Sequence, residues 1–193
     1  MVDFTPGLFE IPPHVRAEMR GVSWHDHRAC PAFEALRLLK LRHHTFAGAV
    51  SMGELVVHAR VAEEVLAIFE RLFAAGFPLA SLRRVDVFAG DDERSMAANN
   101  SSGFNFRKVQ GTELLSHHAY GLAIDINPVQ NPWLHAGRVD PPEGRAYLDR
   151  EHIRPGMIVR PGVVLEVFEA AGWVWGGDEV GAPDFHHFSK PTG

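Results

Sequence analysis

Residues 116–128 read SHHAYGLAIDINP, and the organisation of the rest of the chain can be worked out from them. A helix is disfavoured in this segment, because Gly121 weakens a helix and Pro128 ends it. The apolar run at residues 122–126 instead predicts a short buried strand. Successive side chains of a strand point to opposite faces, so the two isoleucines share one face and Asp125 lies on the other.

A carboxylate that points inward from an apolar strand is costly unless a cation meets it. A metal ion would neutralise Asp125, and His118 is a second candidate ligand. Catalytic zinc sites usually need three protein ligands, and residues 184–188, DFHHF, offer His187 as the third. The net positive charge of such a site would acidify a bound water, and Asp184 is then the spare carboxylate that takes the proton.

Two spaced patterns carry a resemblance to a known family. They are SxHxxGxAxD at residues 116–125 and DxxH at residues 184–187. In this order they resemble the signature of the zinc D-Ala-D-Ala carboxypeptidase family, which also holds D-Ala-D-Ala dipeptidases and L-alanyl-D-glutamate endopeptidases. The likeness continues through residues 99–107, 127–128 and 173–177. It therefore covers roughly residues 85–190, which we interpret as the zinc peptidase catalytic region.

The resemblance implies a zinc metallopeptidase that hydrolyses a bond in peptidoglycan stem peptides or other D-Ala-containing peptides. Zinc would be held by His118, Asp125 and His187, with water in the fourth position. Asp184 would act as general base and then return the proton to the leaving amine. Arg107 would face the substrate and stabilise either the oxyanion of the intermediate or a substrate carboxylate.

Four further residues near these motifs are candidates for smaller roles. Ser116 either hydrogen-bonds substrate or holds His118 in place. Tyr120 is a candidate for the wall of the substrate cleft. His117 and His186 each adjoin a ligand in sequence, so we expect them to point away from the metal unless one of them replaces its neighbour.

The sequence leaves the cleaved bond open between L-alanyl-D-glutamate and D-Ala-D-Ala. Asp184 and the Trp-Gly-Gly segment at residues 175–177 favour the endopeptidase branch. A catalytically inactive zinc-bearing binding module on the same scaffold is a second hypothesis, because hedgehog domains show that the scaffold can serve that way. A phage-type lysin is a third.

Composition limits the partners. The formal net charge of −5 gives no reason to expect nucleic acid, and we expect a monomer. No run is long and apolar enough for a membrane span. A single cysteine, Cys30, excludes an internal disulfide and is expected to be a small buried hydrophobe. No secretory signal is visible in the first residues, so the protein works in the cytoplasm, is exported by another route, or has had its leader removed.

The expected fold is a single α+β domain over residues 1–193, because helices and short strands follow one another without regular β-α-β alternation. The resembled family has a small antiparallel sheet flanked by helices, related in shape to the hedgehog signalling domain. Apolar spacings of three and four predict helices at residues 59–75 and 163–171.

Other segments are predicted with less regular structure. Residues 1–30 are expected to form an irregular arm that Trp24 anchors to the body. A short amphipathic helix is expected from Pro31 to about Lys40, and a strand at residues 85–88. Residues 89–116 are interpreted as a polar functional loop, and residues 128–162 as a second irregular run broken by prolines.

Overall fold

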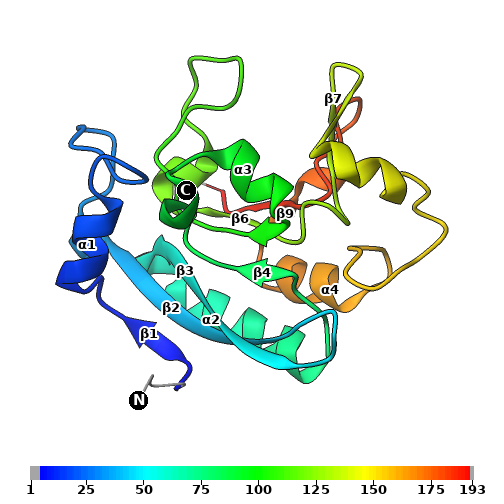
Figure 1. Cartoon of the computed structure of the whole chain (residues 1–193), viewed down its shortest axis with the longest axis horizontal. Helices are drawn as coiled ribbons and strands as arrows, with labels where there is room; N and C mark the ends of the chain where they lie inside the picture. The colour runs from blue at the N-terminus through cyan, green and yellow to red at the C-terminus, as the bar shows by residue number, and fades with distance from the viewer. Residues whose placement is uncertain (1–4, 192–193) are drawn as a thin grey trace.

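The computed structural model describes residues 5–191, which form short sheets, α-helices and 3₁₀ helices (Figure 1). The α-helices are α1 (Pro13–Met19), α2 (Ala59–Ala74), α3 (Asp92–Ala97) and α4 (Val163–Ala170). The 3₁₀ helices are η1 (Phe33–Ala35), η2 (Val85–Phe88), η3 (His117–Tyr120), η4 (Pro142–Tyr147) and η5 (Gly176–Asp178). The strands are β1 (Gly7–Phe9), β2 (Leu36–His44), β3 (Val50–His58), β4 (Ser81–Leu82), β5 (Asn100–Ser101), β6 (Ala123–Asp125), β7 (Trp133–His135), β8 (Arg138–Asp140), β9 (Val174–Trp175) and β10 (His187–Ser189). The fold is α+β, as predicted.

The first sheet is antiparallel, with strand order β1-β2-β3. Its central strand, β2, is covered on both faces: Leu36 and Leu38 pack in a cluster with α1, whereas Leu39 and Leu41 pack in the main core with α2. The predicted short helix ending near Lys40 was therefore wrong. A strand that is buried on both faces lacks apolar–polar alternation, so its leucines also fit a helical spacing.

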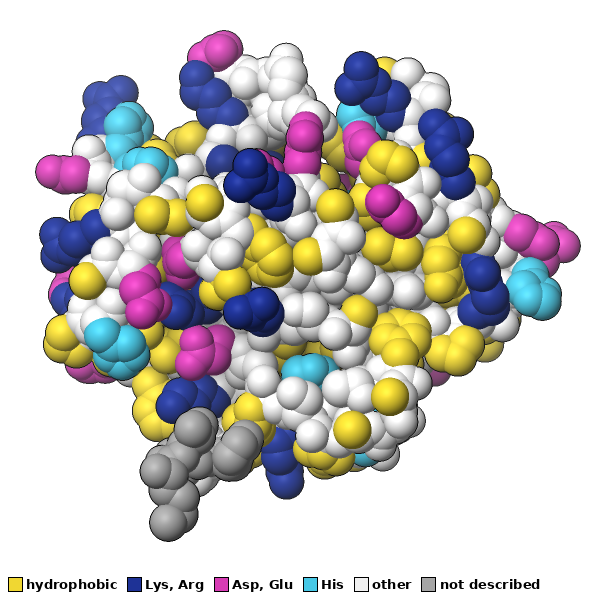
Figure 2. Space-filling model, in the orientation of Figure 1, with side chains coloured by type: hydrophobic (Ala, Val, Ile, Leu, Met, Phe, Trp, Pro, Cys, Tyr) yellow, Lys and Arg dark blue, Asp and Glu magenta, His cyan; other side chains and the backbone are white. Residues whose placement is uncertain are grey.

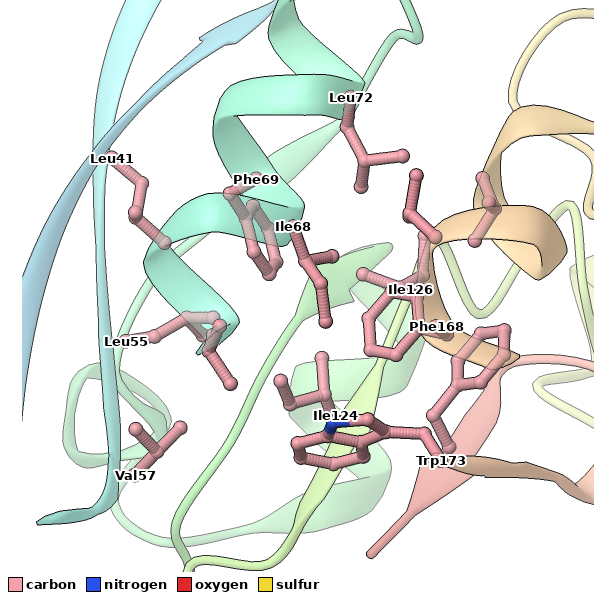
Figure 3. Close-up of a cluster of buried hydrophobic side chains, with 14 of the residues drawn as sticks. Leu41, Leu55, Val57, Ile68, Phe69, Leu72, Ile124, Ile126, Phe168 and Trp173 are labelled. Atoms are coloured by element: carbon pink, nitrogen blue, oxygen red, sulfur yellow. The ribbon is translucent and has the colours of Figure 1, made fainter. Parts of the chain in front are cut away.

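Helix α2 covers one face of this sheet and confirms the helix predicted over residues 59–75. Its inner side chains lie between the first sheet and the C-terminal half of the chain. Figure 3 shows Ile68 and Leu72 on the side of Ile126 and Phe168, and Phe69 nearer Leu41 and Leu55. Each such burial of a large apolar side chain is worth about 1.5–3 kcal/mol. The two halves therefore share one core.

The second sheet is also antiparallel, with order β6-β10-β9 and strands of two or three residues. Strand β6 occupies the middle of the strand predicted at residues 122–126. Helix α4 packs beside α2, as the pattern at residues 163–171 predicted. In Figure 1 the C-terminal strand runs next to β6, so segments far apart in sequence form one surface.

The N-terminal arm is more regular than expected, because it contains β1 and α1. Helix α1 begins directly at the tandem prolines: Pro13 takes the first helical position, where the missing N–H has no intrahelical partner to lose. Trp24 does anchor the arm. Its ring stacks on Phe33 at a centroid distance of 4.5 Å, and its Nε1 donates to the Pro31 carbonyl at 2.8 Å.

Three further predictions of local structure needed correction. The expected strand at residues 85–88 is the 3₁₀ helix η2. The polar segment 89–116 contains α3 and β5, and the irregular run 128–162 contains the β7–β8 hairpin and η4. Elements of two to six residues are too short to show a periodicity, which explains why the sequence pattern missed them.

None of the helices within residues 5–191 has the length and apolar character needed to cross a membrane. On the face seen in Figure 2, acidic and basic side chains are interspersed. Cys30 is half-buried beside the cluster that packs against α1.

Candidate metal centre

Strand pairing brings two of the three predicted ligands together. Strands β6 and β10 are antiparallel, and their register places His187 directly opposite Asp125. Residues opposite each other in a pair share a face of the sheet. As a result His187 Nδ1 lies 3.0 Å from Asp125 Oδ1, although the two residues are 62 positions apart.

The third candidate, His118, reaches the same point from η3. This helix ends at Gly121, whose positive φ of 67° reverses the chain into β6. A side chain at Gly121 would also collide with the backbone of His58, because its Cβ would lie 2.6 Å from the His58 backbone nitrogen. The turn therefore needs glycine both for its conformation and for its space.

The His118 ring is held in one orientation. Its Nδ1 donates to the Gly103 carbonyl oxygen at 2.6 Å, which leaves Nε2 unprotonated in the neutral ring and available as a ligand. That Nε2 lies 3.1 Å from Asp125 Oδ2 and 3.3 Å from His187 Nδ1. His118 and Asp125 are both buried, and His187 is partly exposed.

These three residues form a cluster whose ligand atoms all lie within 4.8 Å of one another. Burial alone would raise the pKa of the Asp125 carboxyl, but the neighbouring imidazoles of His118, His186 and His187 hold that pKa well below its ordinary value. An ionised carboxylate at this depth, with imidazole nitrogens beside it, is a donor set typical of zinc. The residues present fit a zinc ion.

Asp184 lies next to this cluster, in the turn that precedes β10. Its side chain is 18% exposed, and its backbone contacts Gly176, where a Cβ would approach the Asp184 carbonyl oxygen to 2.8 Å. Burial raises the pKa of the Asp184 carboxyl and the charge of Asp125 adds to the rise, although nearby histidines oppose it. A carboxyl with a raised pKa is better suited to accept a proton.

A cavity of about 730 Å³ opens onto the cluster and Asp184. Arg107 and Ser116, both predicted from the sequence, line it. Ser116 Oγ also accepts a hydrogen bond from the His118 backbone N–H at 3.3 Å, so it caps η3. Tyr120 is not among the lining residues and instead packs, partly buried, against the hydrophobic core, so the structure does not place it at the cleft.

The expectation that His186 points away from the site needed correction. His186 is only 3% exposed, and its Nδ1 donates to the Asn131 carbonyl at 2.8 Å. Its Nε2 lies 3.1 Å from Asp184 Oδ1, although the angles do not make this contact a hydrogen bond. Strand alternation predicted the opposite direction, but β10 begins only at His187, so His186 belongs to the turn. His117 is exposed at the cavity wall.

Arg107 has a partner that the sequence did not indicate. Its Nη2 lies 2.7 Å from Asp92 Oδ2. Asp92 is the first residue of α3, the helix that was expected to be loop. Since α3 was not predicted, the sequence offered no signal for this pair.

Comparison with known proteins supports a family for the segment that holds the cluster. No curated protein and no solved structure matches the chain. A family model described as D-alanyl-D-alanine carboxypeptidase matches residues 110–190. The matched segment contains the metal cluster and Asp184, and it ends three residues after His187. Arg107 lies just outside it. The match supports the broad D-alanyl-D-alanine carboxypeptidase family for the part of the chain that holds the candidate metal centre.

Proposed function

We propose that this protein is a zinc-dependent peptidase that cleaves peptidoglycan stem peptides. The observation that carries the proposal is the cluster of His118, Asp125 and His187, with Asp184 next to it at the base of an open cavity. The match of the same segment to a peptidase family model supports it. A structural zinc site would instead be closed by a fourth protein ligand.

The proposed zinc ligands are His118 through Nε2, His187 through Nδ1 and a carboxylate oxygen of Asp125. Two neutral nitrogens and one anionic oxygen leave the site with a net positive charge. When bound, zinc supplies Lewis-acid chemistry, which acidifies water and polarises a carbonyl group.

Asp184 is the proposed general base. Its partly exposed carboxylate borders both the cluster and the cavity, where it can accept a proton from the attacking water. It then delivers that proton to the leaving amine, as the same group acts first as base and then as acid. Arg107 offers N–H donors from the cavity wall to the oxygen that gains negative charge in the intermediate.

The experiment is a product analysis with the zinc-loaded full-length chain and purified stem peptides. Mass spectrometry distinguishes the two candidate bonds: D-alanine is released by a D-Ala-D-Ala carboxypeptidase, whereas an endopeptidase separates L-alanine from D-glutamate. Asp184→Asn is the matched control, because it keeps the size of the side chain and removes the base. We expect it to retain zinc and to lose about 10²–10⁴-fold in rate.

The result also decides the alternative of an inactive binding module. A protein that binds zinc, binds stem peptide and cleaves neither bond would contradict the peptidase and support the module. Cleavage that persists at the wild-type rate in Asp184→Asn would remove Asp184 from the mechanism.

A further inference from the structure

The guanidinium group of Arg107 already has protein partners on two of its three nitrogens. Nη2 lies 2.7 Å from Asp92 Oδ2, and Nη1 donates to the Lys108 carbonyl at 3.3 Å. The two paired side chains are 25% and 23% exposed, so neither is free in solvent. Nε is buried and has no hydrogen-bond partner within the described part of the chain.

The choice of nitrogen determines what Arg107 can still bind. A guanidinium group grips a carboxylate with two parallel N–H donors, either from Nη1 and Nη2 or from Nε and Nη2. Both pairs include Nη2, and the Asp92 carboxylate beside that nitrogen uses one of its N–H donors and would repel a second carboxylate placed there. The remaining donors suit a single oxygen atom, such as the oxyanion of a peptide-bond intermediate, better than both oxygens of a carboxylate.

The backbone of Asp92 is held in place, so its carboxylate stays beside Arg107. Helix α3, which begins at Asp92, is capped by the side chain of Asp91 and anchored through Ser95, whose buried hydroxyl accepts from Asn100 Nδ2 at 3.0 Å. Asn100 in turn belongs to β5. The carboxylate therefore projects from a fixed backbone, and a substrate cannot move it aside without breaking the ion pair.

The other charged side chains around the cavity also disfavour the binding of a substrate carboxylate. Among its described lining residues, the other lysine or arginine is Lys108, whose ammonium group pairs with Glu113. No unpaired lysine or arginine is thus left, within the described lining, to receive a substrate carboxylate. Glu93 and Glu179 add negative charge to the same cavity.

We propose that Asp92 is a positioning and specificity-determining residue: it fixes Arg107 for single-oxygen donation and disfavours a carboxylate on the residue that follows the cleaved bond. The preferred substrate class is a peptide in which that residue carries a carboxamide or continues as peptide. The substrate preference rests on the proposed peptidase function, whereas the ion pair between Asp92 and Arg107 does not depend on that function.

The first test needs no catalysis. Phenylglyoxal modifies accessible guanidinium groups, and peptide mapping by mass spectrometry follows Arg107 individually. We expect slow modification in the wild type and faster modification in Asp92→Asn. Glu93→Gln is the matched control, because it removes one negative charge from the same turn of α3 while its partner is Gln110, and it should leave the Arg107 rate unchanged. Equal rates in wild type and Asp92→Asn would overturn the positioning role.

The second test measures specificity with the zinc-loaded chain. Two stem peptides are compared that differ only in a carboxylate or a carboxamide on the residue after the cleaved bond. We expect the wild type to have the higher kcat/KM for the carboxamide, and Asp92→Asn to shift the ratio toward the carboxylate by about tenfold, which corresponds to about 1.4 kcal/mol. Glu93→Gln removes a charge of the same cavity without touching Arg107 and should shift the ratio much less than Asp92→Asn does.

The outcomes are distinct. A wild-type preference for the carboxylate, or an unchanged ratio in Asp92→Asn, overturns the specificity role. A shift of the same size in Glu93→Gln reduces the effect to general charge and also overturns it. Failure of the wild type to cleave either peptide rejects the proposed function and the substrate preference with it, whereas the labelling result still decides whether Asp92 holds Arg107.

Discussion

The two three-stranded sheets of this protein use their buried positions differently. The first sheet and α2 fill theirs with aliphatic and aromatic side chains, and β2 is apolar on both faces. The second sheet has strands of two or three residues, and it places Asp125 and His187 side by side where apolar residues would be expected. One sheet supplies much of the apolar core, and the other carries two of the three candidate metal ligands.

The polar character of the second region extends beyond the ligands. Asn127 and Asn131 are fully buried and bind backbone groups of neighbouring loops, which the short strands leave without partners. Buried polar groups contribute little net stability when satisfied, but they cost much when a partner is lost. We therefore expect the stability of the apolar region to be independent of metal binding, and that of the site region to depend on complete hydrogen bonding.

Phe69→Ala provides the largest expected change in stability. The Phe69 side chain is 2% exposed within the shared core, and its removal should lower the free energy of unfolding by about 3–5 kcal/mol. Chemical denaturation with zinc and with a chelator measures it. The loss of stability should be similar with zinc and with the chelator, because the space left by the missing ring lies in the apolar core and away from the candidate metal centre. A loss that doubles when zinc is removed would contradict the independence of the apolar region from the candidate metal centre.

Asn131→Ala should have a somewhat smaller effect, about 3 kcal/mol, because it leaves several buried backbone groups unpaired. Its Nδ2 donates to the Gly156 carbonyl at 2.9 Å, and its Oδ1 accepts from the Ile158 N–H at 2.7 Å. Denaturation together with a zinc titration measures both stability and affinity for the metal. Gln130→Ala is a nearby comparison with fewer backbone bonds. Equal losses for the two variants would contradict the role given to Asn131.

Ser116→Ala should have the smallest effect, about 1 kcal/mol, since it removes one cap of a short helix. Ser116→Thr keeps the hydroxyl group and should restore most of the loss. If Ser116 acts on substrate instead, the alanine variant will raise KM while stability stays unchanged. Paired denaturation and kinetics therefore separate the two roles that the sequence left open.

Prediction from the sequence succeeded where chemistry or periodicity was strong. The apolar spacing in residues 59–75 gave α2, and the inward carboxylate of Asp125 led to His118 and His187. Prediction failed where contacts between distant parts of the chain determine the local structure. The leucines of β2 fit a helix as well as a two-sided strand, and the direction of His186 depends on where β10 begins.

The partner of Arg107 was also beyond reach from the sequence. Asp92 is 15 residues away in a segment with no sustained periodicity, and its position follows from the packing of α3 against β5 and η2. Only the folded structure shows that the two charges meet. The same holds for the hydrogen bond from His118 to Gly103, which orients a ligand that the motif had already named.

The most direct test of the central claim is the zinc content of the purified full-length protein, measured beside that of His118→Ala. His118 provides one of three proposed ligands, and its ring is fixed toward the other two. We predict about one zinc per chain in the wild type and almost none in the variant, with the fold retained by circular dichroism. No zinc in the wild type after reconstitution, or equal zinc in both proteins, would contradict the account.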